Sequence, residues 1–270
     1  MSDDSKVKKT NRYSAIIERI FFDHFQTEMM EFEFSRTEVI SVAEALDISP
    51  PKNIGDLIYS FRYRYELPNS ILATANTGLE WIIEGCGQAR YRFKQVKLNR
   101  ITPREELLTI KIPDSTPEII GAYALSDEQA LLAKVRYNRL IDIFLGITAY
   151  SLQNHLRTNI AGVGQIEIDE MYVGVDKYGR QFVVPVQAKG GNDKHGVVQT
   201  SQDIIYCQKK FPNLVCRAVS AQFMSDERIA MFELTIQGDE IKVVEERHYQ
   251  LVPSNAINHS DLATYALHGH

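Results

Sequence analysis

Residues 165–189 read as two apolar-rich runs separated by a short turn, a pattern typical of a β-hairpin. The turn reads D-K-Y-G-R from Asp176 to Arg180. Aspartate suits the first position of such a loop, and Gly179 can take the left-handed conformation that ends a three-residue loop in a bulge. We therefore expect Asp176 to pair with Arg180, which fixes the register of both strands.

This register brings four polar side chains to one face of the hairpin. Counting back from the turn places Asp169 opposite Gln187 and Glu167 opposite Lys189, and side chains alternate between faces along a strand. The other face is expected to turn to the core and holds Ile166, Ile168, Val184, Val186 and Ala188. A loop one residue longer or shorter would divide the polar set between the two faces.

Composition and charge restrict the class of protein. The chain has 270 residues, of which 44% are hydrophobic and 24% charged, which is typical of a folded protein with two domains. Its net charge of −5 means that a nucleic-acid partner would have to bind local basic patches. We expect no membrane partner, because no run approaches about 18 apolar residues and the polar N-terminus has no apolar signal core. Three scattered cysteines (Cys86, Cys207 and Cys216) suit reduced thiols in the cytoplasm.

Residues 99–270 predict an α/β (α+β) domain with a mixed sheet. We expect a helical region from Ser126 to about Arg157, with a break near Asn138, followed by the hairpin. A helix over residues 197–211 and strands over 215–223, 228–236 and 241–251 come next. A crossover after Lys189 would make the strand at 215–223 parallel to the second strand of the hairpin.

Residues 12–98 predict a mainly helical N-terminal domain. Helical spacing covers residues 13–30, and Ser35 with Glu38 forms a capping-box pattern before a second helix. A third helix over residues 53–64 precedes two strands joined by a turn. Three helices followed by a hairpin resemble a winged-helix module in element order.

The charge distribution agrees with DNA binding by this N-terminal domain. Residues 12–51 contain three basic and eight acidic side chains, whereas residues 52–97 contain seven basic and four acidic ones. A helix in the major groove and a strand ribbon against phosphates would need basic and polar side chains. The candidates on the third helix and the ribbon are Lys52, Asn53, Arg62, Arg64, Arg90, Arg92 and Lys94.

The polar face of the hairpin has the residue types needed to hydrolyse a phosphodiester. Mg²⁺ prefers oxygen ligands, so the carboxylate of Asp169, the amide oxygen of Gln187 and the backbone carbonyl of Ala188 are candidate ligands. Lys189 would orient the attacking water and offset developing charge. Glu167 or Glu170 would compensate for the missing second carboxylate, and the expected register places Glu167, but not Glu170, on the face of Asp169.

These residues resemble the PD-(D/E)xK nuclease superfamily. Asp169 matches its central acid, and residues 187–189 match its second motif in a Gln-x-Lys form. The resemblance implies a restriction-endonuclease-like core and Mg²⁺-dependent cleavage. Two residues depart from the usual pattern, because Ile168 replaces a frequent proline and Gln187 replaces an acid. The sequence Gln202-x-x-x-Tyr206 also fits a pattern of the following helix in RecB-like nucleases.

A second resemblance covers much of the C-terminal half. Residues 164–176, 185–191 and 248–253 are similar to runs shared by a group of prokaryotic restriction-type endonucleases. This implies a type II site-specific deoxyribonuclease acting on double-stranded DNA, and cutting both strands implies a homodimer.

Three alternatives remain open from the sequence. One is a structure-specific DNA-repair nuclease. Another is a catalytically inactive DNA-binding regulator with a nuclease fold, for which Gln187 is the best support. The third is a protein-interaction scaffold without a DNA partner.

Overall fold

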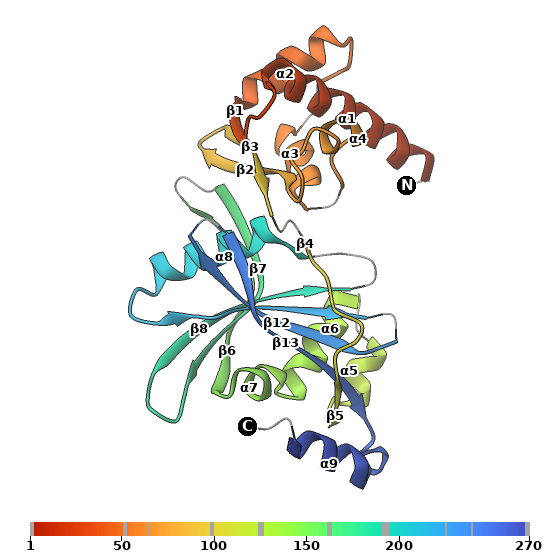
Figure 1. The fold of residues 1–270 in the computed structure, drawn as a ribbon, viewed down its shortest axis with the longest axis vertical. Helices are drawn as coiled ribbons and strands as arrows, with labels where there is room; N and C mark the ends of the chain where they lie inside the picture. The colour runs from red at the N-terminus through yellow and green to blue at the C-terminus, as the bar shows by residue number, and fades with distance from the viewer. Residues whose placement is uncertain are drawn as a thin grey trace. The chain divides into compact units, whose positions relative to one another are not determined.

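We analysed a computed structural model that describes residues 3–50, 53–63, 65–97, 100–123, 127–160, 164–190, 195–224, 226–238 and 240–267. The described part is a mixed α/β protein with nine α-helices and an eight-stranded mixed sheet. The chain divides into two compact units (Figure 1). The first comprises residues 1–99 with the short segments 159–165 and 196–199, and the second comprises the remainder. The boundary expected after residue 98 falls beside this division.

The first unit consists of helices around a three-stranded antiparallel sheet of order β1-β3-β2. Its elements are α1 (Asp3–His24), β1 (Glu31–Ser35), α2 (Arg36–Ala45), α3 (Ile54–Tyr63), α4 (Asn69–Leu72), β2 (Glu80–Gly87) and β3 (Arg90–Val96). The predicted capping box is confirmed, because the Ser35 hydroxyl accepts from the Glu38 amide and the Glu38 carboxylate accepts from the Ser35 amide. Phe21 packs edge-to-face on Trp81 and Phe93 at the centre of the core.

Strand β1 was not predicted. The helix expected to run to residue 30 ends at His24, and residues 31–35 form a strand. Its alternation is that of a strand, because Phe32 and Phe34 are buried whereas Glu31 and Glu33 face outward.

The second unit is built around the large sheet, whose order is β5-β13-β12-β11-β8-β7-β6, with β10 beside β8. Its strands are β5 (Thr109–Pro113), β6 (Thr148–Ile160), β7 (Gly164–Val175), β8 (Gln181–Lys189), β10 (Val215–Cys216), β11 (Ala218–Phe223), β12 (Ile229–Gln237) and β13 (Glu240–Val252). Its helices are α5 (Glu118–Tyr123), α6 (Asp127–Tyr137), α7 (Leu140–Leu145), α8 (Val197–Lys210), the 3₁₀ turn η1 (Ser254–Ala256) and α9 (His259–Leu267). Two further strands have two residues each, β4 (Arg100–Ile101) and β9 (His195–Gly196).

The crossover from β8 through α8 to β11 matches the prediction, because β11 is parallel to β8. The pairs β7–β8, β11–β12 and β12–β13 are antiparallel, so the sheet is mixed. The second unit is therefore the α/β domain with a mixed sheet that the sequence indicates.

The helix predicted to continue to about Arg157 was wrong in its second half. The break near Asn138 is present, because Arg139 adopts a left-handed conformation between α6 and α7. Helix α7 then ends at Gly146, which has a φ of 64° and is suited to stop a helix. The following segment, which begins with Thr148-Ala149-Tyr150 and ends with Thr158-Asn159-Ile160, forms β6 instead.

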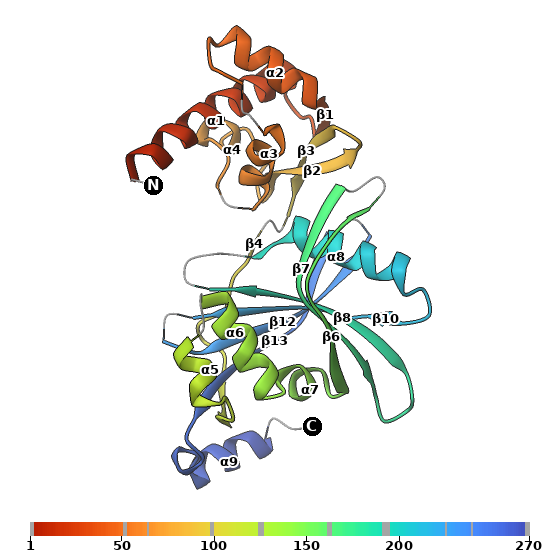
Figure 2. The ribbon, with the colours of Figure 1, turned by 180° about the vertical axis from the view of Figure 1, so that it is seen from behind.

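Helices cover both faces of the large sheet (Figure 1, Figure 2). Helices α6 and α7 pack on one face through an apolar core, and we call this the apolar face. The strand residues of this core include Val184, Val186, Ala188, Val219, Ala221, Met231 and Tyr249. Helix α8 packs on the opposite face, which we call the polar face for the side chains described below.

No described helix combines the length and apolar character that crossing a membrane requires.

Candidate functional site

The predicted register of the hairpin is confirmed over the paired residues. The ladder between β7 and β8 runs from Val175 opposite Gln181 to Glu170 opposite Val186. Gly179 has the expected positive φ, of 80°, and the Asp176 carboxylate accepts hydrogen bonds from two amides of the turn. Continuing this register places Asp169 opposite Gln187 on the polar face.

Side chains connect β7 and β8 beyond the end of this ladder. The Asp169 carboxylate accepts a hydrogen bond of 2.8 Å from the Ala188 amide. The Gln187 carboxamide donates one of 2.8 Å to the carbonyl oxygen of Glu167. The two strands are thus held together by the polar residues themselves at this point, which fixes the positions of Asp169 and Gln187.

Gln187 also contacts Asp203, a neighbour that the sequence did not predict. Its amide nitrogen, Nε2, also donates to Oδ2 of Asp203 on α8, at 2.8 Å. Gln187 and Asp203 are each 2% exposed. Burial raises the pKa of Asp203 well above the usual range, and the nearby Asp169 acts in the same direction. The bond joins α8 to the centre of the sheet.

Asp169 lies in a mixed electrostatic environment. Burial raises its pKa, while the Ala188 amide and the Lys189 ammonium partly oppose that rise. Glu128 and Glu167 add a smaller contribution that raises the pKa further. A cation placed beside Asp169 would favour the ionised form of its carboxyl group.

Lys189 and Glu167 each have an ionic partner. The Lys189 ammonium lies 3.6 Å from a carboxylate oxygen of Glu128, at the start of α6, and is 17% exposed. The Glu167 carboxylate accepts hydrogen bonds of 2.9 and 2.8 Å from Arg157 on β6, a side chain that is 68% exposed. Each pair has one partner at the surface, where ion pairs are weak, about 0–1 kcal/mol.

Glu170, the neighbour of Asp169, lies on the opposite face of β7. It is fully buried, and its carboxylate accepts from Arg136 at 2.9 Å and from Ser151 at 2.7 Å. This agrees with the prediction that Glu170 is not on the face of Asp169.

Polar side chains continue across the sheet from the hairpin. The strand registers align two rows on the polar face from β8 to β13. Continuing the β7–β8 register adds Glu167 to the first row and Asp169 to the second. The first row contains Glu167, Lys189, Gln222, Ala230 and His248. The second row contains Asp169, Gln187, Ser220, Phe232 and Glu246. Ser220, Gln222 and His248 are at most 4% exposed, so the polar side chains of these rows are buried over β11 and β13.

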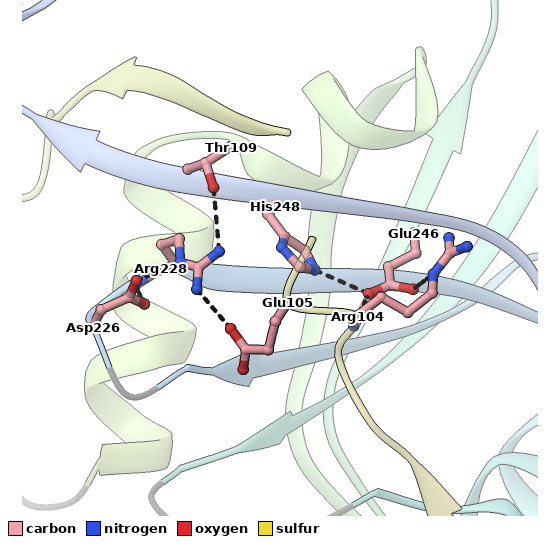
Figure 3. A network of polar contacts seen from close by, with 7 residues as sticks. All are labelled: Arg104, Glu105, Thr109, Asp226, Arg228, Glu246 and His248. Carbon is pink, nitrogen blue, oxygen red and sulfur yellow. Dashed lines mark hydrogen bonds and ion pairs between the residues drawn. The ribbon is translucent and has the colours of Figure 1, made fainter. Parts of the chain in front are cut away.

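The far end of these rows forms a buried network around Glu246 and His248 (Figure 3). One Glu246 oxygen accepts from His248 Nε2 at 2.9 Å and from the Arg104 amide at 2.8 Å. The other accepts from the Arg104 guanidinium at 2.7 Å. Arg228 lies beside this group and binds Glu105 at 2.8 Å. Segment 101–105 therefore crosses the polar face over β11 to β13.

The oxygen donors of the hairpin suit Mg²⁺. The carboxylate of Asp169 and the carboxamide oxygen of Gln187 are hard ligands. Ala188 donates its amide to Asp169, and the amide and carbonyl of one strand residue point toward the same neighbouring strand. Among the described residues, no group of three or more His, Cys, Asp or Glu side chains is arranged to hold a metal. A cation here would depend on amide and carbonyl oxygens, water and substrate.

Five of the seven predicted DNA-contacting residues are described, and Lys52 and Arg64 lie outside the described residues. Asn53 is exposed, and its side chain accepts from the Gly55 amide at 3.1 Å. Arg62 lies partly buried in the last turn of α3.

The remaining three lie on one face of β3, beside the residues of β1 with which they pair, and are Arg90, Arg92 and Lys94. Arg90 pairs with Glu33, and Arg92 with Glu31 and Glu33 at 3.2 Å. The sequence did not predict these ion pairs, because the strand that carries Glu31 and Glu33 was not recognised.

Two cavities of about 340 Å³ lie outside the polar rows. One is lined by Arg136, Arg139 and Tyr172 among others, and the second by Phe144, Arg217 and Tyr249 among others. Both borders involve α7 and the apolar face, so neither includes the polar rows.

The structure thus brings Asp169, Gln187, Ala188 and Lys189 together and adds Asp203 and Glu128, which the sequence did not single out. Asp203 lies inside the Gln202-x-x-x-Tyr206 pattern, so that segment held a signal. Glu128 lay in the segment predicted to open a helix. No protein-family model, curated protein or solved structure matches this chain.

Proposed function

We propose that this chain is a Mg²⁺-dependent endonuclease that cuts double-stranded DNA at a specific sequence, as type II restriction enzymes do. The observation that carries the proposal is the convergence of Asp169, Gln187 and Lys189 on one face of β7 and β8. They lie beyond the end of the backbone ladder between β7 and β8, where hydrogen bonds from side chains join the two strands. Acidic, amide and ammonium groups fixed together on rigid strands are suited to metal-assisted hydrolysis.

Each residue has a role that follows from its chemistry. When bound, Mg²⁺ supplies charge neutralisation at the phosphate and a more acidic water. Asp169, Gln187 and the Ala188 carbonyl would hold the ion through oxygen atoms. The Lys189 ammonium would orient the attacking water and offset charge that develops on the phosphate. Its contact with Glu128 keeps it near the site between turnovers.

The topology supports a nuclease of the PD-(D/E)xK type. An antiparallel hairpin carries the polar residues, a helix (α8) follows, and the next long strand returns parallel to β8. The resemblance drawn from residues 169 and 187–189 implies this order of elements.

The first unit supports a DNA partner. Its order of helix, strand, two helices and two strands, with β1 as the third strand of the sheet, is compatible with a winged helix. The pairs made by Arg90 and Arg92 lie at the surface, where an ion pair contributes about 0–1 kcal/mol. A phosphate can therefore replace Glu31 or Glu33 as their partner. Two such chains in a two-fold homodimer would cut both strands.

A catalytically inactive DNA-binding regulator is the second candidate. The observation in its favour is the burial of Gln187, whose amide nitrogen already binds Glu167 and Asp203. A neutral amide is also a weaker cation ligand than a carboxylate.

The experiment that separates these functions uses unmethylated plasmid DNA incubated with the purified protein in Mg²⁺, in Mn²⁺ and in EDTA. The nuclease proposal expects discrete fragments in Mg²⁺ but not in EDTA, and sequencing of their ends should give one short motif. Salt-dependent DNA binding without cleavage in either metal would favour the regulator. Cleavage only at junctions or flaps would assign the chain to repair, and absence of DNA binding would contradict all three.

A further inference from the structure

Strand β6 is exposed on both faces beside the candidate site. It is the last strand in the order of the large sheet, next to β7, and residues 150–155 are all exposed. Arg157 on the same strand contacts Glu167, so β6 borders the polar end of the hairpin. A strand rises about 3.3 Å per residue, which places residues 153 and 155 roughly 7–13 Å along β6 from this contact. That distance corresponds to roughly two to four base pairs of a DNA duplex, at about 3.4 Å each.

The side chains in and beside β6 suit an anionic partner. Residues 148–160 include glutamine, asparagine, histidine, arginine and threonine but no aspartate or glutamate. Two guanidinium groups lie beside the strand. Arg136 donates to Asn154 at 3.3 Å. Arg139 lines the same cavity as Tyr150 of β6. Guanidinium groups bind phosphates, and side-chain amides bind base edges, so a DNA duplex matches both the charge and the chemistry.

A distortion of β6 favours a duplex over a second copy of the chain as the partner. His155 has a φ of 48°, in the left-handed region that residues other than glycine rarely adopt. Ser151 and Asn154 are three positions apart, so a regular strand would turn them to opposite faces. Both contact the ion pair between Arg136 and Glu170 instead. Such irregularities hinder an edge strand from pairing with another strand, which leaves its side chains as the means of contact.

We propose that Gln153 and His155 read base edges of the DNA duplex that the neighbouring candidate site cuts. This inference rests on the proposed function and assigns residues to its sequence specificity. The Gln153 carboxamide can donate to and accept from one adenine in the major groove, which admits a two-stranded ribbon such as β6 with β7. The His155 imidazole can donate to or accept from a base edge, and the distortion at this residue re-aims its side chain. Arg139 would hold a phosphate of the same duplex.

The test compares Gln153→Ala and His155→Gly with Gln237→Ala, which changes an exposed glutamine of strand β12 and serves as the control. Glycine adopts the left-handed conformation readily, so His155→Gly removes the imidazole and keeps the backbone. Arg139→Gln removes one charge beside the strand. Each protein selects from a library of random-sequence duplexes in EDTA, and the bound duplexes are sequenced. Affinity is then measured against salt concentration, and cleavage of the selected duplexes is measured in Mg²⁺.

The proposal expects the wild type and Gln237→Ala to select the same short motif. Gln153→Ala and His155→Gly should each lose the preference at one position, where discrimination between bases falls by about 5- to 100-fold. Their salt dependence should stay that of the wild type, because no phosphate contact is lost. Arg139→Gln should keep the motif, bind every duplex more weakly and reduce the salt slope by about one.

Three outcomes overturn this inference while the wild type still selects a motif. An unchanged motif in both β6 variants would mean that other residues read the bases. Uniformly weaker binding with a smaller salt slope would mean that Gln153 and His155 contact phosphates only. A smaller sedimentation mass in either variant would assign β6 to contacts between copies of the chain. A wild type that selects a motif without cutting in Mg²⁺ overturns the nuclease alone, and one that selects no motif overturns this inference whether or not it cuts.

Discussion

The apolar and polar faces of the large sheet carry opposite chemistry, although the same strands supply both. On β8 and β11, Val186, Ala188 and Ala221 face the core against α6 and α7. Their neighbours Gln187 and Ser220 are equally buried on the other side. Burial of the apolar side chains stabilises the fold. The contacts of buried polar groups offset little of the free-energy cost of removing those groups from water. The comparison indicates that the apolar face stabilises the fold, and the proposed site lies on the other face.

The largest effect is expected from removing the ammonium group of the polar face. Lys189→Ala should lower the cleavage rate by about 100- to 1,000-fold, since a group aimed at developing charge contributes that much. Its stability should change little, because the contact with Glu128 is long and partly exposed. Lys177→Ala, an exposed lysine in the turn of the same hairpin, is the matched control for rate measurements on plasmid DNA. Equal rates for the two variants would contradict the role given to Lys189.

The apolar face should respond in the opposite way. Met231→Ala removes a fully buried side chain from the core against α6 and α7 and should lower the free energy of unfolding by about 2–5 kcal/mol. Urea denaturation measures the loss, and the cleavage rate per folded molecule should remain near that of the wild type. A lost rate without lost stability would show that the two faces do not divide their roles.

A third test measures how the stability of the fold depends on pH through the buried acid Asp203 on the polar side of the sheet. Burial raises the pKa of Asp203 well above its ordinary value, near 3.9. Between the ordinary and the raised pKa, the folded chain binds more protons than the unfolded one, so stability falls as pH rises through that window. Asp203→Asn carries no such proton and should become increasingly more stable than the wild type as pH rises above about 4 through that window. Melting temperatures at both ends measure this, and a difference independent of pH would contradict the assignment.

The smallest effects are expected from two surface arginines, Arg104 at the edge of the polar face and Arg90 on β3 of the first unit. Arg104→Ala removes a partner from Glu246, which is 3% exposed, and should destabilise the fold by about 1 kcal/mol. Arg90→Ala removes the partner of Glu33, which is 36% exposed, and should cost less. Chemical denaturation of both variants makes the comparison, and a larger loss for Arg90→Ala would reverse it.

The parts of the fold that sequence predicted were local. The turn from Asp176 to Arg180 specifies its own geometry, so the strand register followed by counting. The Ser35 capping box likewise needs only residues three positions apart. The parallel return of β11 followed from the helix between the two strands, because a strand–helix–strand crossover brings the chain back in the same direction.

The parts that sequence missed depend on distant segments. Strand β6 was predicted as helix because spacing alone did not show that Gly146 would stop α7. Asp203 meets Gln187 only because α8 folds back onto β8, and Glu246 meets Arg104 across 142 positions of sequence. The pairing of Arg92 with Glu31 required β1 beside β3.

The most direct measurement compares two adjacent acids that point to opposite faces of β7. Asp169→Asn and Glu170→Gln each neutralise one carboxylate and leave the shape of the side chain almost unchanged. Their cleavage of the same plasmid in Mg²⁺ should differ by at least about 100-fold per folded molecule. The account predicts that Asp169→Asn fails to cut while Glu170→Gln cuts near the wild-type rate with lower stability. Normal cutting by Asp169→Asn, or loss confined to Glu170→Gln, would contradict it.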